Sequence, residues 1–227
     1  MISFFNAVNT YTDASVSQDK FGAQVTCAGF VTTFHGEIID RGLKIVRNGT
    51  NNYGEILAIY MGIINLLKYK NYDAFLNLFS DTYISVSGLK EWIYSWLRDK
   101  DEFNRLRTGE GKEVANQEIF SNIINYIVEN QTHLSIFHQR GHKNPDKLGD
   151  MNEVKTKFEK INGTEISEDI VREICYYNNM VDNMTRAHLI DTLKHSNYKP
   201  NTFDKPLIVA SRVLDWNTMN KYKNLIS

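Results

Sequence analysis

Tyr11-Thr12-Asp13-Ala14-Ser15 closes a strand-forming run near the start of the chain. Residues 2–10 are rich in β-branched and aromatic side chains and predict a strand in the core of a sheet. An aspartate at the end of such a strand is unusual, because a buried unpaired carboxylate costs free energy. A turn aspartate that caps the next segment is the ordinary explanation. The positions of the other acids in the chain decide between the two.

The composition excludes several classes of protein. The chain has 227 residues, of which 42% are hydrophobic, and this suits a soluble domain with extensions. A net charge of -1 provides no global positive field, so nucleic-acid binding would depend on local arrangement. Two cysteines form no disulfide framework and indicate a reducing compartment. With no apolar run of roughly 18 to 20 residues and no signal-peptide pattern, we expect a cytoplasmic protein without a membrane partner.

Working outward from Asp13, the pattern predicts two more strands and then a helix. Residues 23–34 and 37–46 are β-prone, and the short turn between them indicates an antiparallel meander. From Asn52 to Lys70 the apolar residues recur at helical spacing. Glu55 falls in the predicted first turn, where a glutamate is commonplace because it complements the helix dipole.

A second strand-end aspartate follows this helix. Residues 75–81 form a short apolar run that ends in Asp81. Strand, helix and strand in this order predict parallel strands whose C-terminal ends share one edge of the sheet. We therefore expect Asp13 and Asp81 to lie at one edge, with Glu55 near them.

The second half of the chain is more polar. Mixed charges at residues 89–112 predict a solvated helix pair. A predicted helix and strand then lead to His142 in a turn, and residues 146–177 suggest an inserted lid or loop-helix element. A last helix, Asn179 to His195, carries Asp182. The tail from Ser196 combines basic and aromatic residues and is expected to pack against the domain rather than to bind nucleic acid.

Four acids therefore stand out: Asp13, Glu55, Asp81 and Asp182. Carboxylates that gather in one place repel each other unless a cation neutralises them. Mg²⁺ is the natural candidate because it prefers oxygen ligands. Two such ions about 4 Å apart can stabilise the entering and leaving oxygens of a phosphoryl displacement, and His142 could carry protons.

The order and spacing of the short motifs resemble type 1 ribonuclease H over about residues 2 to 195. The motifs are Tyr-Thr-Asp-Ala-Ser at 11–15, Thr-Asn-Asn-Tyr-Gly-Glu at 50–55, Phe-Ser-Asp at 79–81, Arg-Gly-His at 140–142 and Asn-Asn-Met-Val-Asp at 178–182. Residues 90–96, with paired tryptophans, and residues 111–116 resemble the family's handle. The resemblance implies an α/β ribonuclease H-like fold: a five-stranded mixed sheet, antiparallel meander then parallel strands, flanked by helices. The expected catalytic domain is 1–195, with a helical handle at 89–115, an insertion at 143–177 before the last helix, and a C-terminal extension at 196–227.

The resemblance also implies roles for single residues. Asp13, Glu55, Asp81 and Asp182 would bind two Mg²⁺ ions, with Mn²⁺ as an alternative, and His142 would be a mobile catalytic histidine. Asn51 and Asn52 would contact the RNA strand, where the 2′-hydroxyl distinguishes RNA from DNA. Thr50 and Asn116 would hold a phosphate of the DNA strand, and Trp92 or Trp96 its sugars. The expected substrate-binding residues are Ser15, Thr50, Asn51, Asn52, Trp92, Trp96 and Asn116.

The expected function is an endoribonuclease, monomeric, that hydrolyses the RNA strand of RNA–DNA hybrids and leaves 5′-phosphate and 3′-hydroxyl ends. A DNA-acting nuclease of the same superfamily and a non-catalytic nucleic-acid- or protein-binding scaffold are the alternatives. The sequence departs from the family at residues 16–21, which replace a glycine-rich turn, and at Asn48, where some members have an arginine. The separation of His142 from Asp182 is also far longer than the family usually has.

Overall fold

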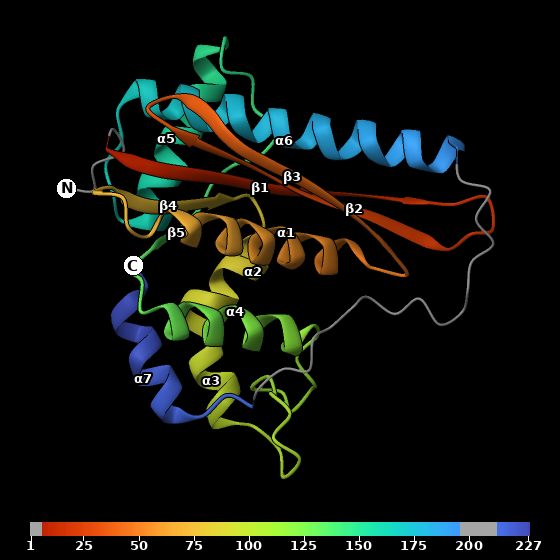
Figure 1. The fold of residues 1–227 in the computed structure, drawn as a ribbon, viewed down its shortest axis with the longest axis vertical. Coiled ribbons are helices and arrows are strands. Elements are labelled where there is room, and N and C mark those ends of the chain that lie inside the picture. The colour runs from red at the N-terminus through yellow and green to blue at the C-terminus, as the bar shows by residue number, and fades with distance from the viewer. Residues whose placement is uncertain (1–5, 196–212) are drawn as a thin grey trace.

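A five-stranded mixed sheet forms the centre of the molecule (Figure 1). The computed structural model describes residues 6–195 and 213–227, so residues 2–5 of the first predicted strand lie outside the described part. The strands are β1 (Ala7–Gln18), β2 (Gln24–Phe34), β3 (Glu37–Arg47), β4 (Phe75–Ser80) and β5 (Ser135–His138), in the order β3-β2-β1-β4-β5. β1, β2 and β3 pair antiparallel, whereas β4 pairs parallel with β1 and β5 parallel with β4. The predicted meander followed by parallel strands is confirmed.

The strand β1 continues beyond Asp13, so the prediction that this aspartate ends its strand was wrong. Asp13 pairs with Gly29 of β2 in the antiparallel ladder. The parallel neighbour β4 stops earlier, because its last pairing joins Ser80 to Thr12. Asp81 is the next residue after that pairing, and the two aspartates therefore meet where β1 runs past the end of β4.

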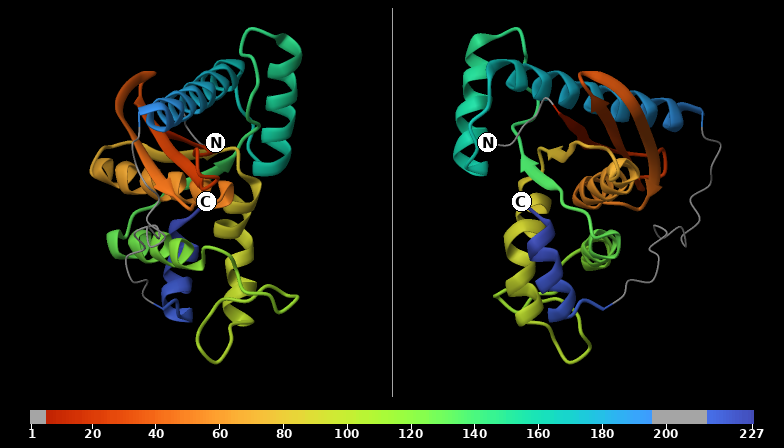
Figure 2. Two further views of the ribbon diagram at one scale, coloured as in Figure 1. Left: turned by 90° about the vertical axis from the view of Figure 1, so that its right-hand side faces the viewer. Right: turned by 60° about the vertical axis from the view of Figure 1, so that its left-hand side comes forward.

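Helices cover both faces of the sheet (Figure 2). They are α1 (Asn51–Leu66) with a 3₁₀ turn (Leu67–Tyr69), α2 (Tyr83–Ser87), a π-helical turn η2 (Gly88–Trp92), α3 (Ile93–Arg98), α4 (Gln117–Asn130), α5 (Leu148–Asn162), α6 (Glu168–His195) and α7 (Trp216–Leu225). The apolar core on one face combines α1 with α2, α3, α4 and α7. The core on the opposite face is formed with α5 and α6. None of the helices within residues 6–195 and 213–227 has the length and apolar composition needed to cross a bilayer.

Two glycines let α1 approach the sheet closely. A Cβ added at Gly62 would lie 2.7 Å from the Thr12 methyl carbon and 3.1 Å from that of Thr10. A Cβ at Gly54 would overlap the Thr26 methyl group. This close packing brings the neighbouring Glu55 against β1. Because α1 begins at Asn51, Glu55 lies in its second turn rather than the predicted first, and its side chain is buried.

The last long helix begins at Glu168 rather than at the predicted Asn179. Its extra turns bury apolar side chains in the core that α6 shares with α5, among them Val171 and Ile174. The helical periodicity of the apolar residues was hard to see in the sequence, because some polar residues of these turns also face the protein interior. Glu173 accepts a hydrogen bond of 3.0 Å from the Tyr11 hydroxyl on β1.

Of the lid and the loop-helix element predicted for residues 146–177, the structure has the loop-helix element, made of α5 and the first part of α6. Met151, Val154 and Phe158 of α5 are buried in the same core as α6. The side chain of Asn162 extends the edge of the sheet, because it accepts from the His138 amide at 3.1 Å and donates to the His138 carbonyl at 2.8 Å. This segment is therefore packed onto β5 (Figure 2).

The predicted solvated helix pair at residues 89–112 is helical only as far as Arg98. Beyond it, a loop is held by Asp101, whose carboxylate pairs with Arg105 at 2.9 Å and with Arg107 at 2.6 Å. The charged residues that suggested a second helix therefore pair with one another within this loop.

The described end of the chain packs against the domain, as predicted. Tyr222 of α7 is fully buried and donates a hydrogen bond of 3.2 Å to the Leu89 carbonyl. Residues 225–227 run beside β5, where Leu134 and Ile226 form a parallel bridge. The basic and aromatic residues of the tail before residue 213 lie outside the described residues.

The packing of α1 predicts different effects of alanine at two helical glycines. Gly62→Ala is expected to lower the free energy of unfolding by about 1–3 kcal/mol, because the added methyl meets stiff β-branched side chains. Gly149→Ala in α5 is the control, since a Cβ there has no atom within 4 Å. Because Gly149 is the second residue of α5, this substitution should instead stabilise only slightly, by about 0.5 kcal/mol or less. Urea unfolding monitored by circular dichroism measures both changes, and equal effects would contradict the close packing.

Candidate active site

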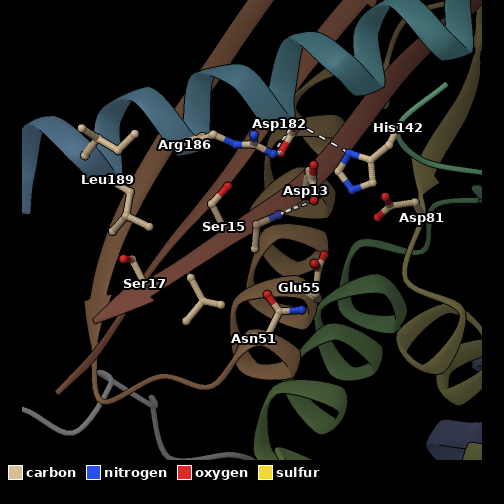
Figure 3. A pocket seen from close by; sticks show the side chains of 13 residues that line it. Asp13, Ser15, Ser17, Asn51, Glu55, Asp81, His142, Asp182, Arg186 and Leu189 are labelled. Atoms are coloured by element: carbon tan, nitrogen blue, oxygen red, sulfur yellow. Dashed lines mark hydrogen bonds and ion pairs between the residues drawn. The ribbon is translucent and has the colours of Figure 1, made fainter. Parts of the chain in front are cut away.

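Three carboxylates from separate elements converge in one pocket (Figure 3). Asp13 comes from β1, Glu55 from α1 and Asp81 from the residue after β4. Each offers a ligand oxygen, and these oxygens all lie within 4.8 Å of one another. The predicted meeting of these acids at one edge of the sheet is confirmed for this trio.

The loop after β5 closes the pocket beside Asp81. His138 contacts the Asp81 carbonyl through its Nε2 at 3.1 Å, and the Gln139 amide donates to Ser80 at 2.9 Å. A Cβ at Gly141 would overlap the Asp81 carboxylate. Glycine at this position therefore allows the backbone to pass directly against the acid, and it delivers His142 to the pocket.

Burial raises the pKa of each carboxyl group in this trio, and repulsion between neighbouring acids adds to the rise. Burial, followed by the charge of Asp81, raises the pKa of Asp13 to about 8. Burial and the neighbouring Asp13 and Asp81 raise the pKa of Glu55 to about 9, although a hydrogen bond from Asn51 opposes this shift. Burial also raises the pKa of Asp81, and the charge of His142 opposes it.

Two buried oxygens of the trio have no hydrogen-bond partner. They are Oδ2 of Asp13 and Oε2 of Glu55, whereas Oδ1 of Asp13 accepts from the Ala14 amide at 2.7 Å. Unsatisfied buried carboxylate oxygens are costly unless a cation or proton meets them. Oxygen ligands of this kind fit a hard divalent cation such as Mg²⁺. The residues therefore suit a metal site at Asp13, Glu55 and Asp81.

Asp182 lines the same pocket but lies outside the trio. Its two carboxylate oxygens are each 3.1 Å from the Arg186 guanidinium, one turn later on α6. The Nδ1 of His142 lies 3.7 Å from Asp182 on the other side. Figure 3 shows the His142 ring between Asp182 and Asp81. Four acids were predicted to form one cluster, and the structure gives the fourth an arginine partner.

The position of Asp182 is fixed by the packing of α6 on the sheet. The buried Thr185 contacts β1 through a hydroxyl pair of 2.8 Å with Ser15, and its hydroxyl donates to the Asp182 carbonyl at 2.9 Å. A Cβ at Gly29 of β2 would lie 2.6 Å from the Thr185 methyl carbon. Ser15, predicted to bind substrate, thus lines the pocket and also anchors the helix that carries Asp182.

Of the predicted substrate residues at the start of α1, one lines the pocket. Asn51 lines the pocket, and Asn52 beside it is exposed. Thr50 is also exposed, but its hydroxyl caps the helix by accepting from the Tyr53 amide at 3.1 Å. Asn51 hydrogen-bonds Glu55 inside the pocket, Asn52 is exposed to solvent, and Thr50 has a structural role as the helix cap.

Trp96 is not available for the predicted contact with a sugar. Only 8% of this residue is exposed, and its ring packs edge-on against Phe120 with a centroid distance of 5.3 Å. Of the two tryptophans, the half-buried Trp92 keeps some surface. Asn116 is half-buried and precedes α4 in a left-handed conformation, with φ of 58°.

Arg186 is a charged pocket residue that the sequence did not predict. The signal was present, because an arginine four residues after an aspartate on a helix places the two side chains together. The positive charge of Arg186 also acts on Asp13, because it opposes the rise in the pKa of that carboxyl group.

The comparisons with known proteins agree with this architecture. The RNase H family model matches residues 6–156, a range that includes the trio and His142 but ends before Asp182. No curated protein matches the chain.

Two solved structures share the fold at low sequence identity. One is the foamy viral protease-reverse transcriptase in complex with RNA/DNA hybrid, at 13% identity and a TM-score of 0.52, covering 81% of this chain and 21% of that chain. The other is the foamy viral protease-reverse transcriptase in complex with dsDNA, at 16% identity and a TM-score of 0.50, covering 71% of this chain and 95% of that chain. The chain thus spans about a fifth of the length of the first.

The raised pKa values predict that the metal-free protein loses stability as the pH increases. The unfolded chain releases the protons of Asp13 and Glu55 near their ordinary pKa values of 3.8 and 4.5, whereas the folded chain keeps them up to about 8 and 9. Between these limits the folded state binds more protons, so a higher pH favours unfolding. Thermal unfolding in EDTA at pH 5, 7 and 9 should show a falling midpoint.

Asp13→Asn should flatten this dependence and raise the midpoint at pH 8 by at least about 2–4 °C, equivalent to about 1 kcal/mol. The exposed Asp73→Asn is the matched control and should keep the wild-type slope. Mg²⁺ should restore stability at pH 9 in the wild type more than in Asp13→Asn. A midpoint that is constant or rises with pH in EDTA would contradict the assignment.

Proposed function

The chain belongs to the RNase H family, and on that premise we propose that it is a metal-dependent endonuclease that hydrolyses the RNA strand of RNA–DNA hybrids, leaving 5′-phosphate and 3′-hydroxyl ends. The observation that carries the proposal is the trio Asp13, Glu55 and Asp81, with two buried oxygens that have no partner. Burying these carboxylates together costs free energy unless a cation binds them. The trio lines an open pocket, so a ligand can reach it.

Asp13, Glu55 and Asp81 would hold the first of two Mg²⁺ ions, and Asp182 with Asp13 would contribute to the second. Bound there, the ions supply the charge that activates water and stabilises the departing oxygen of the cleaved phosphodiester. The trio contributes three oxygens from rigid elements, so little rearrangement is needed to bind. Asp182 must exchange its pairing with Arg186 to take part, because both of its oxygens face that guanidinium.

His142 would move a proton during the reaction. The side chain of His142 is 66% exposed, and its Nδ1 is 3.7 Å from Asp182, so the ring has room to turn between the acid and a substrate. Its backbone is left-handed, with φ of 56°, and the adjacent Gly141 packs against Asp81, so the ring lies between Asp182 and Asp81 (Figure 3). Such a position suits a general acid or a proton carrier that assists the leaving group.

Selection of the RNA strand would come from the first turn of α1. Asn51 lines the pocket and Asn52 is the next, exposed residue of the helix, and their side-chain amides can both donate and accept hydrogen bonds. A 2′-hydroxyl in the minor groove is the group that tells RNA from DNA at such a site. Recognition by shape and hydroxyl contact is consistent with a net charge of only -1.

Asp81→Asn is expected to lower the cleavage rate of a labelled RNA–DNA hybrid by about 1000-fold or more, because a ligand of the ions is lost and transition-state charge stabilisation is worth several kcal/mol. Asp73→Asn, on the exposed loop before β4, should cleave like the wild type. The measurement is the single-turnover rate in Mg²⁺ and in EDTA. Undiminished cutting by Asp81→Asn would refute the metal site.

RNA and DNA duplexes of the same sequence, tested in the same assay, distinguish the proposed function from the two alternatives, a DNA-acting nuclease and a non-catalytic scaffold. Preferred cleavage of the DNA duplex would favour a DNA-acting nuclease. Binding of nucleic acid without any cleavage in Mg²⁺ or Mn²⁺ would favour a scaffold.

Asn52→Ala is expected to weaken binding of the hybrid about 5- to 10-fold, as the loss of one hydrogen bond of about 1 kcal/mol implies. The effect should be absent with DNA duplex, because no 2′-hydroxyl is present. Asn220→Ala on the exposed face of α7 is the control. Fluorescence anisotropy in EDTA measures binding without turnover. An equal loss for both duplexes would show that Asn52 contacts the backbone instead of the hydroxyl.

A further inference from the structure

We propose that Glu153 of α5 is a positioning residue for His142, because it pairs with the residues on both sides of the Gly141-His142 step. The proposal deepens the proposed function, since it concerns how that histidine is held at the site. It also gives a role to the segment between His142 and Asp182, which is unusually long for the family resemblance.

One carboxylate contacts both flanks of the histidine. Oε2 of Glu153 lies 2.6 Å from the Lys143 Nζ, and Oε1 lies 3.7 Å from the Arg140 Nε. Oε1 is also 2.7 Å from the Lys157 Nζ, one turn later on α5. The side chain of Lys143 is only 19% exposed, so its pairing with Glu153 is partly shielded from water. The two lysine contacts are short, charge-assisted hydrogen bonds, whereas the Arg140 contact is a longer ion pair.

His142 itself has few contacts that fix its place. Its side chain is 66% exposed, and its Nδ1 lies 3.7 Å from the Asp182 carboxylate. The backbone at His142 is left-handed, which a non-glycine residue adopts only when its surroundings impose it. The surroundings are Gly141, pressed against Asp81, and the flanking pair Arg140 and Lys143. The geometry of the ring therefore depends on how these two flanking residues are held.

The helix α5 is a firm base for this contact. Val154, next to Glu153, is fully buried in the core that α5 shares with α6. Asp150 of α5 accepts from the Asn144 amide at 3.0 Å, which fixes the loop further along. Asp150 also approaches Lys143 at 3.5 Å, but among the ion pairs of the described residues it is Glu153 that also reaches Arg140. Glu153 thus links the core to both sides of His142.

The test compares Glu153→Gln with Glu159→Gln. Glu159 is an acid on the same helix that accepts from the Ile166 amide, and within the described part of the chain it forms no ion pair with Arg140, His142 or Lys143. Glu153→Gln is expected to lower kcat on the hybrid about 10-fold, because small misplacements of a reacting group are costly, with KM changed less than about twofold. Glu159→Gln should change neither constant. Thermal midpoints close to the wild type would confirm that both variants fold.

A double-mutant cycle with His142→Ala distinguishes positioning from a general effect of α5. If Glu153 acts through His142, adding Glu153→Gln to His142→Ala produces no further loss of kcat. A further loss of about 10-fold in that background would overturn the proposal.

Nuclear magnetic resonance of the metal-free protein provides a readout that does not need activity. The chain has six histidines, and the His142→Ala spectrum assigns the ring signal of His142. Glu153→Gln should shift or broaden that signal and leave the other histidine signals in place, whereas Glu159→Gln should not. An unchanged signal would overturn the proposal. Absence of cleavage by the wild type would instead count against the proposed function, with the ring signal still deciding the role of Glu153.

Discussion

The crowding of buried carboxylates at one point of the sheet is the constraint on which the rest of the site depends. Asp13 and Glu55 each keep a buried oxygen without a partner, and burial holds the pKa of both groups far above their ordinary values. A fold that needed only stability would not gather such groups, because each costs free energy in the absence of a proton or a cation. A divalent ion that binds there would offset this cost, because binding to the folded state adds to its stability.

The scaffold enforces this crowding with small residues at the points of closest approach. Gly54 and Gly62 let α1 press onto the sheet, which drives Glu55 toward β1. Gly141 lets the loop after β5 run against Asp81. The offset between β1 and the shorter β4 leaves Asp13 and Asp81 adjacent at the point where the parallel pairing stops. Each device acts on the backbone, so the positions of the carboxylates are set before any ligand arrives.

The sequence predicted the features that depend on local pattern and order, and it failed where an interaction joins distant residues. The mixed sheet and the convergence of Asp13, Glu55 and Asp81 follow from strand and helix periodicity together with a family resemblance, and the structure bears them out. The early start of α6 was hidden, because Glu173 faces inward to reach Tyr11 across 162 positions of the chain. Burial of Trp96 was hidden too, since a tryptophan in a charged stretch gives no sign of whether Phe120 will cover it.

The two halves of the candidate site differ in how their charge is balanced, and this difference suggests an order of events. Within residues 6–195 and 213–227, no side-chain cation forms an ion pair with the trio on β1, α1 and the end of β4, whereas Asp182 on α6 is paired with Arg186. The first half therefore has the greater demand for an ion, and the second can bind one only when its arginine gives way. A substrate phosphate is an anion that Arg186 could meet in place of Asp182. Entry of the substrate would then release Asp182 from Arg186, so that Asp182 could bind a metal ion. Because both residues lie on α6, this helix would couple substrate binding to metal binding.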